Sequence, residues 1–366
     1  MAAYTNARIF TGEQWIEKGT VVCDKGRIIS VGTEVINGDN TVVDCGGNIL
    51  IPALLDLQIY GLGGKLFSAY PEAESLRILA KENKKAGVVA CLATIATQPL
   101  DVIYECIAAI KDYWQQGGGG ILGMHLEGPF MNPVKRGAHK LEWIHAPTEK
   151  EVADLIYTGK EVIKIVTVAP EVCSPKIIRM FIDAGIKVSA GHCNAGYEQA
   201  IQFSGAGVTL VTHLFNAMSP LHHRDTGLPG ATFQDHKLFA SIIPDGIHVS
   251  FSALNIAKTL MGDRLFFITD SVTTTNIGAY QHQLNKDHYC TADGTLSGSA
   301  ITMLQGVKNA MRHAGISLEE SIRMASFYPA RAMGIENDYG AISQGKKASM
   351  ILINKQFELV GNFIRD

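Results

Sequence analysis

Eight short apolar runs, each about as long as a buried strand, recur through the middle of this chain of 366 residues. Almost every run is followed by a stretch with helical periodicity, a pattern typical of parallel strands joined by helices. The runs span residues 54–60, 88–93, 121–126, 165–168, 187–190, 209–212, 240–243 and 265–268. Eight such units predict an α/β fold, a (β/α)8 barrel of the TIM type. A doubly wound open sheet is the alternative, which the lack of a G-x-G-x-x-G loop at the first unit disfavours.

The two ends of the chain differ in texture from its middle. Short β-type runs separated by Gly and Asn turns fill residues 1–50, and the same texture returns near the C-terminus. Two β-rich ends that flank a long α/β middle indicate a second, smaller domain. We therefore expect one small β-sandwich domain formed by residues 1–50 and 338–366, and a barrel domain formed by residues 51–337.

Charge and cysteine content narrow the classes of partner and compartment. The chain has 32 Lys and Arg against 35 Asp and Glu, and a net charge of −3 gives no field suited to binding nucleic acid or an anionic membrane. An anionic substrate must then be bound by a few cationic side chains near the site. Seven cysteines without a C-x-x-C pair are typical of reduced thiols. Because the sequence also lacks a signal-peptide pattern and any apolar run of membrane-spanning length, we expect a soluble, cytoplasmic protein.

Four side chains able to bind a metal or carry a proton lie where predicted barrel strands end. Glu127 ends the third strand, and His192 follows the fifth. His213 ends the sixth strand, and Asp270 ends the eighth. Because catalytic groups of α/β barrels gather at the C-terminal ends of the strands, we expect all four side chains to face one mouth.

One carboxylate and two imidazoles form a three-ligand set that leaves a coordination position open for water, as in catalytic zinc sites. We therefore expect Glu127, His192 and His213 to hold one divalent cation. Asp270 is then the residue that accepts the proton of the water and later donates it. Taken singly, a histidine after a strand is more often a hydrogen-bonded core or loop residue. The coincidence of all four groups at strand ends favours the site.

A second group of polar residues is suited to binding an anion. Arg224 lies shortly after His213, His139 lies between predicted strands three and four, and His248 follows strand seven. Donors around the mouth of the barrel suit a phosphate or carboxylate of a substrate. Taken singly, each of these residues is more often a solvated loop residue.

Several motifs stand in order and with compatible spacing between the N-terminal sheet and about residue 355. The most specific are His-Leu-Glu-Gly-Pro from His125 and Thr-His-Leu-Phe-Asn-Ala-Met from Thr212. The supporting motifs are Ala-Gly-His-Cys-Asn-Ala from Ala190, Asp-Gly-Ile-His from Asp245, Ile-Thr-Asp-Ser from Ile268 and Leu-Ser-Gly-Ser from Leu296. Together the motifs resemble those of the N-acetylglucosamine-6-phosphate deacetylases of the amidohydrolase superfamily.

This resemblance implies hydrolysis of the acetamide of N-acetyl-D-glucosamine 6-phosphate to D-glucosamine 6-phosphate and acetate, in amino-sugar catabolism and recycling. It implies that Glu127, His192 and His213 ligate the metal, and that Asp270 is the general base and then the acid. The family positions that contact the sugar phosphate are Ala138, His139, Asn216, Ala217, Arg224, Asp245, Gly246, Ile247, His248, Leu296, Ser297 and Gly298. The resemblance also implies a homodimer or larger assembly, in which Arg224 or His139 reaches the neighbouring site.

The first strand departs from the pattern of many amidohydrolases, which carry His-x-His there and use it to bind a second metal. In this chain the two positions are Gln58 and Tyr60. A glutamine is a poor, neutral ligand, and a tyrosine has to lose a proton whose ordinary pKa is about 10. We therefore expect a single cation, with Gln58 as a neighbour of the metal-bound water. Zinc is the expected ion, and the ligand types also admit iron, cobalt or manganese.

Two other functions fit the same residues. A metal-dependent hydrolase of this kind can act on a different amide, on a cyclic amide or on a base that it deaminates. Alternatively, the loss of His-x-His is the starting point of a barrel that binds a sugar phosphate without catalysis. Arg224, His139 and His248 favour a phosphorylated substrate over a neutral ring, and the complete one-metal set with Asp270 favours an enzyme.

Overall fold

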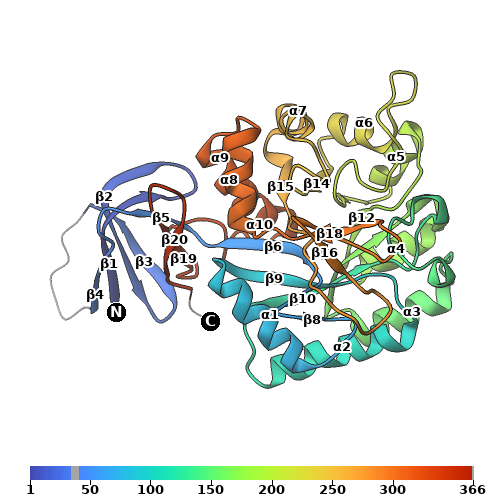
Figure 1. Cartoon of the computed structure of the whole chain (residues 1–366), viewed down its shortest axis with the longest axis horizontal. Helices are drawn as coiled ribbons and strands as arrows, with labels where there is room; N and C mark the ends of the chain where they lie inside the picture. Colours follow the sequence, from blue (N-terminus) through green and yellow to red (C-terminus); the bar gives the residue numbers. More distant parts are fainter. Residues whose placement is uncertain (34–40, 365–366) are drawn as a thin grey trace.

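The computed structural model describes residues 1–33 and 41–364 of the chain. Two bodies lie side by side in it (Figure 1): a sheet domain, which contains the N-terminus, and a larger α/β barrel. The predicted sheet domain of residues 1–50 and 338–366 includes residues 34–40 and 365–366, which lie outside the described residues.

The barrel is an eight-stranded parallel sheet whose strands follow one another in sequence order. Its strands are β6 (Leu54–Ile59), β9 (Val88–Ile95), β10 (Ile121–Glu127), β11 (Ile163–Val168), β12 (Lys187–Ala190), β13 (Leu210–Val211), β14 (Phe239–Ile242) and β15 (Leu265–Phe267). The sheet closes just beyond β15, where Tyr60 N donates to Ser271 O (2.9 Å) and Asp270 N donates to Gln58 O (3.0 Å). The predicted (β/α)8 barrel is therefore confirmed.

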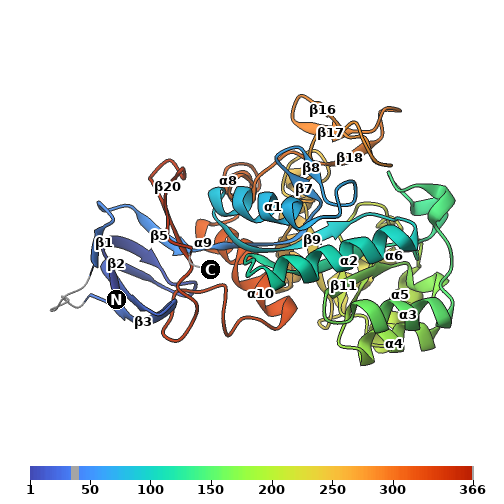
Figure 2. The ribbon, with the colours of Figure 1, turned by 90° about the horizontal axis from the view of Figure 1, so that it is seen from below.

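Helices cover the outside of the barrel (Figure 2). They are α1 (Ala73–Lys85), α2 (Leu100–Gln115), α3 (Glu149–Gly159), α4 (Pro175–Asp183), α5 (Tyr197–Gly205), α6 (Gly227–Gln234), α7 (Phe251–Met261), α8 (Met303–His313), α9 (Leu318–Ala325) and α10 (Phe327–Met333). Local sequence fixes where several of them begin. The Ser174 hydroxyl accepts from Ile177 N at the start of α4, and Thr148 forms a capping box with Glu151 at the start of α3. Their apolar faces pack with the strands into one core.

The sheet domain is built from both ends of the chain. Its strands are β1 (Ala2–Phe10), β2 (Trp15–Asp24), β3 (Arg27–Gly32), β4 (Thr41–Asp44), β5 (Ile49–Pro52), β19 (Met350–Ile353) and β20 (Leu359–Asn362). The sheet folds back on itself, because Ile28 N in β3 donates to Lys346 O (2.9 Å), just before β19. Apolar side chains from both ends of the chain fill the space that the sheet encloses. They form a small core that is separate from the core of the barrel.

A three-stranded antiparallel sheet follows the last barrel strand and was not anticipated from the sequence. It consists of β16 (Gln283–Asn285), β17 (His288–Cys290) and β18 (Leu296–Ser299), and it stands off one end of the barrel (Figure 2). A smaller hairpin of β7 (Gly61–Leu62) and β8 (Lys65–Leu66) follows the first barrel strand. Both insertions leave the C-terminal ends of barrel strands, where the predicted site lies.

Two further expectations concern the whole chain. Cys45, Cys91, Cys106, Cys173, Cys193 and Cys290 are free thiols, and all of these except Cys290 are buried. Within the described ranges, no helix combines the length and the apolar character needed to cross a membrane.

Candidate active site

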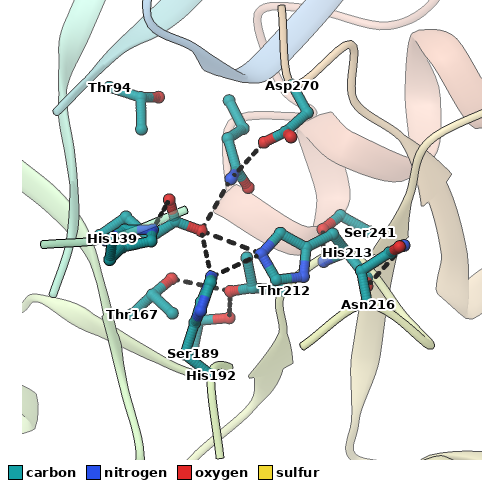
Figure 3. A network of polar contacts seen from close by, with 12 residues as sticks. Thr94, His139, Thr167, Ser189, His192, Thr212, His213, Asn216, Ser241 and Asp270 are labelled. Atoms are coloured by element: carbon teal, nitrogen blue, oxygen red, sulfur yellow. Dashed lines mark hydrogen bonds and ion pairs between the residues drawn. The ribbon is translucent and has the colours of Figure 1, made fainter. Parts of the chain in front are cut away.

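The four residues predicted at strand ends meet at one mouth of the barrel. Glu127 is the last residue of β10, and the other three lie in the short segments that follow β12, β13 and β15. All four side chains are buried. His192, His213 and Asp270 have positive φ angles of 48°, 34° and 54°, a conformation that non-glycine residues rarely adopt and that costs of order 1–3 kcal/mol each. Figure 3 shows His192, His213 and Asp270 turned towards one shared position.

Three atoms at this position form a nearly equilateral triangle. His213 Nε2 lies 3.0 Å from Glu127 Oε1 and 3.1 Å from His192 Nε2, and His192 Nε2 lies 3.3 Å from Glu127 Oε1. Two ligands bound at about 2.0–2.1 Å to a tetrahedral ion are separated by roughly 3.3–3.4 Å. The triangle therefore fits three ligands of a single divalent cation.

The hydrogen bond on the far side of His192 prepares it to be a ligand. Its Nδ1 lies 2.9 Å from the carbonyl oxygen of Lys135, so Nδ1 carries the hydrogen and donates it. The lone pair is then on Nε2, which faces the triangle, as is usual for metal-bound imidazoles. His213 Nδ1 has no partner among the described residues, which leaves its tautomer free to place a lone pair on Nε2.

His139 also reaches this cluster, and Glu127, His139 and His192 offer ligand atoms within 4.8 Å of one another. The surroundings of its ring argue against a ligand role. The backbone N–H of Thr97 donates to His139 Nδ1 (3.2 Å), so the hydrogen of the neutral ring is on Nε2. Nε2 in turn donates to Glu127 Oε2 at 3.2 Å. The geometry thus favours His213 as the third ligand and makes His139 a hydrogen-bond donor at the pocket wall.

The two carboxylates of the site have opposite electrostatic surroundings. Burial opposes ionisation of Glu127, but the contacts of its carboxylate with the rings of His139, His192 and His213 outweigh burial and hold its pKa well below the usual range. Burial and then the negative charge of Glu127 raise the pKa of Asp270 well above the usual range. Two titratable groups pushed in opposite directions are the pattern expected of a ligand beside a proton carrier.

Gln58 and Tyr60 occupy the space between these carboxylates. Gln58 Nε2 donates to Asp270 Oδ1 at 2.7 Å and lies 3.0 Å from Glu127 Oε1. The Tyr60 hydroxyl donates to Glu127 Oε2. Burial and the charges of Glu127 and Asp270 raise the pKa of Tyr60 well above its ordinary value, so the phenol keeps its proton.

A pocket of about 210 Å³ opens at the mouth, and most of the predicted substrate contacts line it. These are Ala138, His139, Asn216, Ala217, His248, Leu296, Ser297 and Gly298. Asp245, Gly246 and Ile247 do not line the pocket. Asp245 instead holds His248, since its Oδ2 lies 2.5 Å from His248 Nδ1 and its Oδ1 accepts from His248 N at 2.8 Å.

Arg224 is a further predicted contact that does not line the pocket of its own chain. It is exposed, and it sits in a turn closed by hydrogen bonds between the backbones of His222 and Asp225. His139, which belongs to the same predicted group, is instead buried against Glu127. The exposed Arg224 can therefore contact groups outside its own chain, whereas the buried His139 cannot.

Several pocket residues were not predicted from the sequence. Tyr280 and His282 contribute from the segment that leads into β16, and Ala96, Ile243 and Val272 provide apolar wall. Burial lowers the pKa of His282 to about 4, so its ring is neutral near pH 7, and its Nδ1 lies 2.9 Å from Ser297 Oγ. The sequence does contain a pattern that indicates Tyr60, since this residue stands two positions after Gln58 and alternate residues of a strand share a face. No such pattern marks the pocket residues that lie in loops.

The closed barrel and its cluster of one carboxylate, two imidazoles and one aspartate define the class of metal-dependent barrel hydrolases. The chain belongs to the amidohydrolase family, whose model matches residues 49–364. Within that family it is similar to the N-acetylglucosamine-6-phosphate deacetylase of Haemophilus influenzae, with 33% identity over 99% of this chain and 97% of the relative. The Bos taurus enzyme of the same name is 32% identical over 99% of this chain and 93% of its own.

Solved structures agree with these relatives. N-acetylglucosamine-6-phosphate deacetylase from Pasteurella multocida superposes with a TM-score of 0.94 at 32% identity, over 99% of this chain and 98% of that one. A mutant of the Mycobacterium smegmatis enzyme in complex with N-acetyl-D-glucosamine-6-phosphate gives 0.91 at 25% identity, over 98% of this chain and 96% of that one. The family resemblance inferred from the motifs is therefore confirmed.

Proposed function

We propose that this chain hydrolyses the acetamide of N-acetyl-D-glucosamine 6-phosphate to D-glucosamine 6-phosphate and acetate. The observation that carries the proposal is the triangle of Glu127 Oε1, His192 Nε2 and His213 Nε2 beside Asp270, in a pocket of amino-sugar size. Relatives that match nearly the whole chain bear the name of this activity.

In the proposed reaction, Glu127, His192 and His213 hold the cation. When bound, the cation supplies positive charge that lowers the pKa of a water molecule and polarises the amide carbonyl. Asp270 accepts a proton from the attacking water through Oδ2, the oxygen that makes no hydrogen bond among the described residues. The same carboxyl group then donates this proton to the amide nitrogen as the C–N bond breaks, leaving acetate and a free amine.

The sugar phosphate is held by the rest of the pocket in this proposal. His248 is oriented by Asp245, which fixes the ring nitrogen that points away from the carboxylate as the one available to a ligand. Asn216 and Ala217 lie on the segment that follows His213, so they place substrate contacts within a few residues of a metal ligand. His139 lies at the wall of its own site, with its Nε2–H directed at Glu127 Oε2.

We propose further that the chain forms a homodimer or a larger assembly in which Arg224 reaches the neighbouring site. The exposure of Arg224 and its absence from its own pocket support this arrangement. His139 does not suit that role, because it is buried beside Glu127. Two nitrogen ligands and one oxygen ligand suit zinc among the candidate metals, and the free thiols of Cys45, Cys91, Cys106, Cys173, Cys193 and Cys290 suit the reducing environment of the cytoplasm.

The test is acetate release by the purified, metal-loaded protein from N-acetylglucosamine 6-phosphate, from N-acetylglucosamine and from a cyclic amide. We expect turnover of the phosphorylated sugar. Loss of the phosphate should lower kcat/KM roughly 10–100-fold, because hydrogen bonds to charged groups contribute about 1.5–3 kcal/mol. Preferred hydrolysis of the cyclic amide would transfer the chain to the alternative function, and no turnover with any of the three would favour a binding protein.

A further inference from the structure

We propose that Tyr60 is a positioning residue that, together with Gln58, presents Glu127 to the cation through one oxygen only. This role presupposes the metal site of the proposed function. Tyr60 takes the position at which a second histidine would complete His-x-His on the first barrel strand.

Strand geometry brings the two residues to the same place. Gln58 lies within β6 and Tyr60 directly after it, so their side chains leave the same face of the strand. Both are buried at the mouth, with exposed fractions of 1% and 8%. Gln58 Nε2 lies 3.0 Å from the Tyr60 hydroxyl oxygen, and the Tyr60 hydroxyl donates to Glu127 Oε2. The result is a directed chain of hydrogen bonds from the amide through the phenol to the carboxylate.

This chain divides the two oxygens of Glu127 between different tasks. Oε2 accepts from the Tyr60 hydroxyl and from His139 Nε2 (3.2 Å), so its lone pairs face donors. Oε1 faces His192 and His213 at 3.3 and 3.0 Å and also lies 3.0 Å from Gln58 Nε2. Because Oε2 faces two donors and Oε1 faces both imidazoles, Oε1 is the oxygen placed to bind the cation, and the carboxylate is held as a ligand through a single oxygen.

The same donors occupy the space between Glu127 and Asp270. Asp270 Oδ1 accepts from Gln58 Nε2 at 2.7 Å and lies 3.4 Å from the Tyr60 hydroxyl oxygen. A second cation needs lone pairs there, whereas the strand presents N–H and O–H groups. The orientation of the Gln58 amide supports this view. Its Oε1 is buried without a partner among the described residues, a cost of about 1–3 kcal/mol that the bonds from Nε2 must offset.

The experiment compares the affinity of the metal-free protein for Zn²⁺ in wild type, Tyr60→Phe and Tyr280→Phe, by competition with a chromophoric chelator. Tyr60→Phe should weaken Zn²⁺ binding roughly 10–100-fold, as expected when a hydrogen bond to a metal ligand is lost. Tyr280→Phe is the matched control, because its hydroxyl also lies at the pocket wall but donates to the backbone oxygen of Thr97. It should bind Zn²⁺ as wild type does.

A spectroscopic measurement separates positioning from general packing. The visible absorption of the Co²⁺-loaded protein should change in Tyr60→Phe, because the freed carboxylate can bind through both oxygens, and should stay unchanged in Tyr280→Phe. The double variant Gln58→His with Tyr60→His should take up a second equivalent of cation. If Tyr60→Phe proves insoluble, Gln58→Met replaces it in the experiment. This substitution removes the amide donors with little change in size, and it should weaken Zn²⁺ binding.

Wild-type affinity and an unchanged spectrum in Tyr60→Phe would overturn the proposal and reduce Tyr60 to a packing residue. These readouts use no substrate. Absence of acetate release from a wild-type protein whose Zn²⁺ affinity depends on Tyr60 would therefore refute the proposed function and leave this inference standing.

Discussion

Replacement of Asp270 by asparagine tests the proposed proton route with little change in shape. Asp270 Oδ1 accepts from Gln58 Nε2 at 2.7 Å, and the backbone N–H of Asp270 donates to Gln58 O at 3.0 Å. The amide oxygen of asparagine can keep the first bond, and the backbone bond is unaffected. The amide NH₂ group then faces the pocket, where it cannot accept a proton from water.

The size of the expected loss follows from the double use of this carboxylate. Asp270 takes a proton from water and returns it to the leaving nitrogen, and a general acid–base group typically contributes about 10²–10⁴-fold to a rate. We expect kcat to fall by roughly 10³-fold, or about 4 kcal/mol at about 1.36 kcal/mol per tenfold. The cation should remain bound, because its three proposed ligands are untouched.

The assay measures acetate release, metal content and binding of glucosamine 6-phosphate on the same protein preparation. Metal content should stay at one equivalent per chain, and the Kd of the product should change by less than roughly threefold. A change of this size is well below the tenfold change in Kd that about 1.4 kcal/mol of binding free energy produces. Asp287→Asn, at an exposed turn between β16 and β17, is the control and should keep full activity. A kcat within tenfold of wild type in Asp270→Asn at full metal content would refute the proton route.

Three further changes test other parts of the structure. His213→Ala should lose the cation, measured by elemental analysis after dialysis, whereas His223→Ala on the exposed turn should retain it. Phe267→Ala, in the fully buried part of β15, should lower the free energy of unfolding by about 3–5 kcal/mol in urea titrations. His282 has a folded-state pKa of about 4 and an unfolded value near 6.5, so the unfolded chain binds more protons between these values and stability falls as the pH falls. His282→Gln should therefore reduce the stability difference between pH 7 and pH 5 by about 2 kcal/mol; an unchanged difference would contradict the assignment.

The barrel and the centre of the site were predictable because both depend on short-range patterns. Apolar runs separated by helical stretches identified the strands, and the residue at the end of each strand followed from the run itself. Glu127 and His213 end or closely follow β10 and β13, and barrel closure then places them together without further information. Even β13, which has two residues where four were expected, kept its position in the order.

Features that depend on tertiary contacts were not predictable. The strands β16 to β18 carry exposed and half-buried polar residues, so they show no apolar alternation that would mark them. His282 belongs to this region, and only the fold reveals that it lines the pocket. Equally, His139 was expected among the substrate contacts, but the contact that argues against a metal-ligand role for it is tertiary. That contact comes from the backbone N–H of Thr97, which fixes the hydrogen on the other ring nitrogen.

The most direct test of the site is an anomalous difference map from crystals of the zinc-loaded protein, with data collected on both sides of the zinc absorption edge. We expect one peak per chain, about 2.0–2.3 Å from Glu127 Oε1, His192 Nε2 and His213 Nε2, with the Asp270 carboxylate on its open side. A peak ligated by His139 in place of His213, two peaks in one mouth, or a peak elsewhere in the barrel would contradict the account.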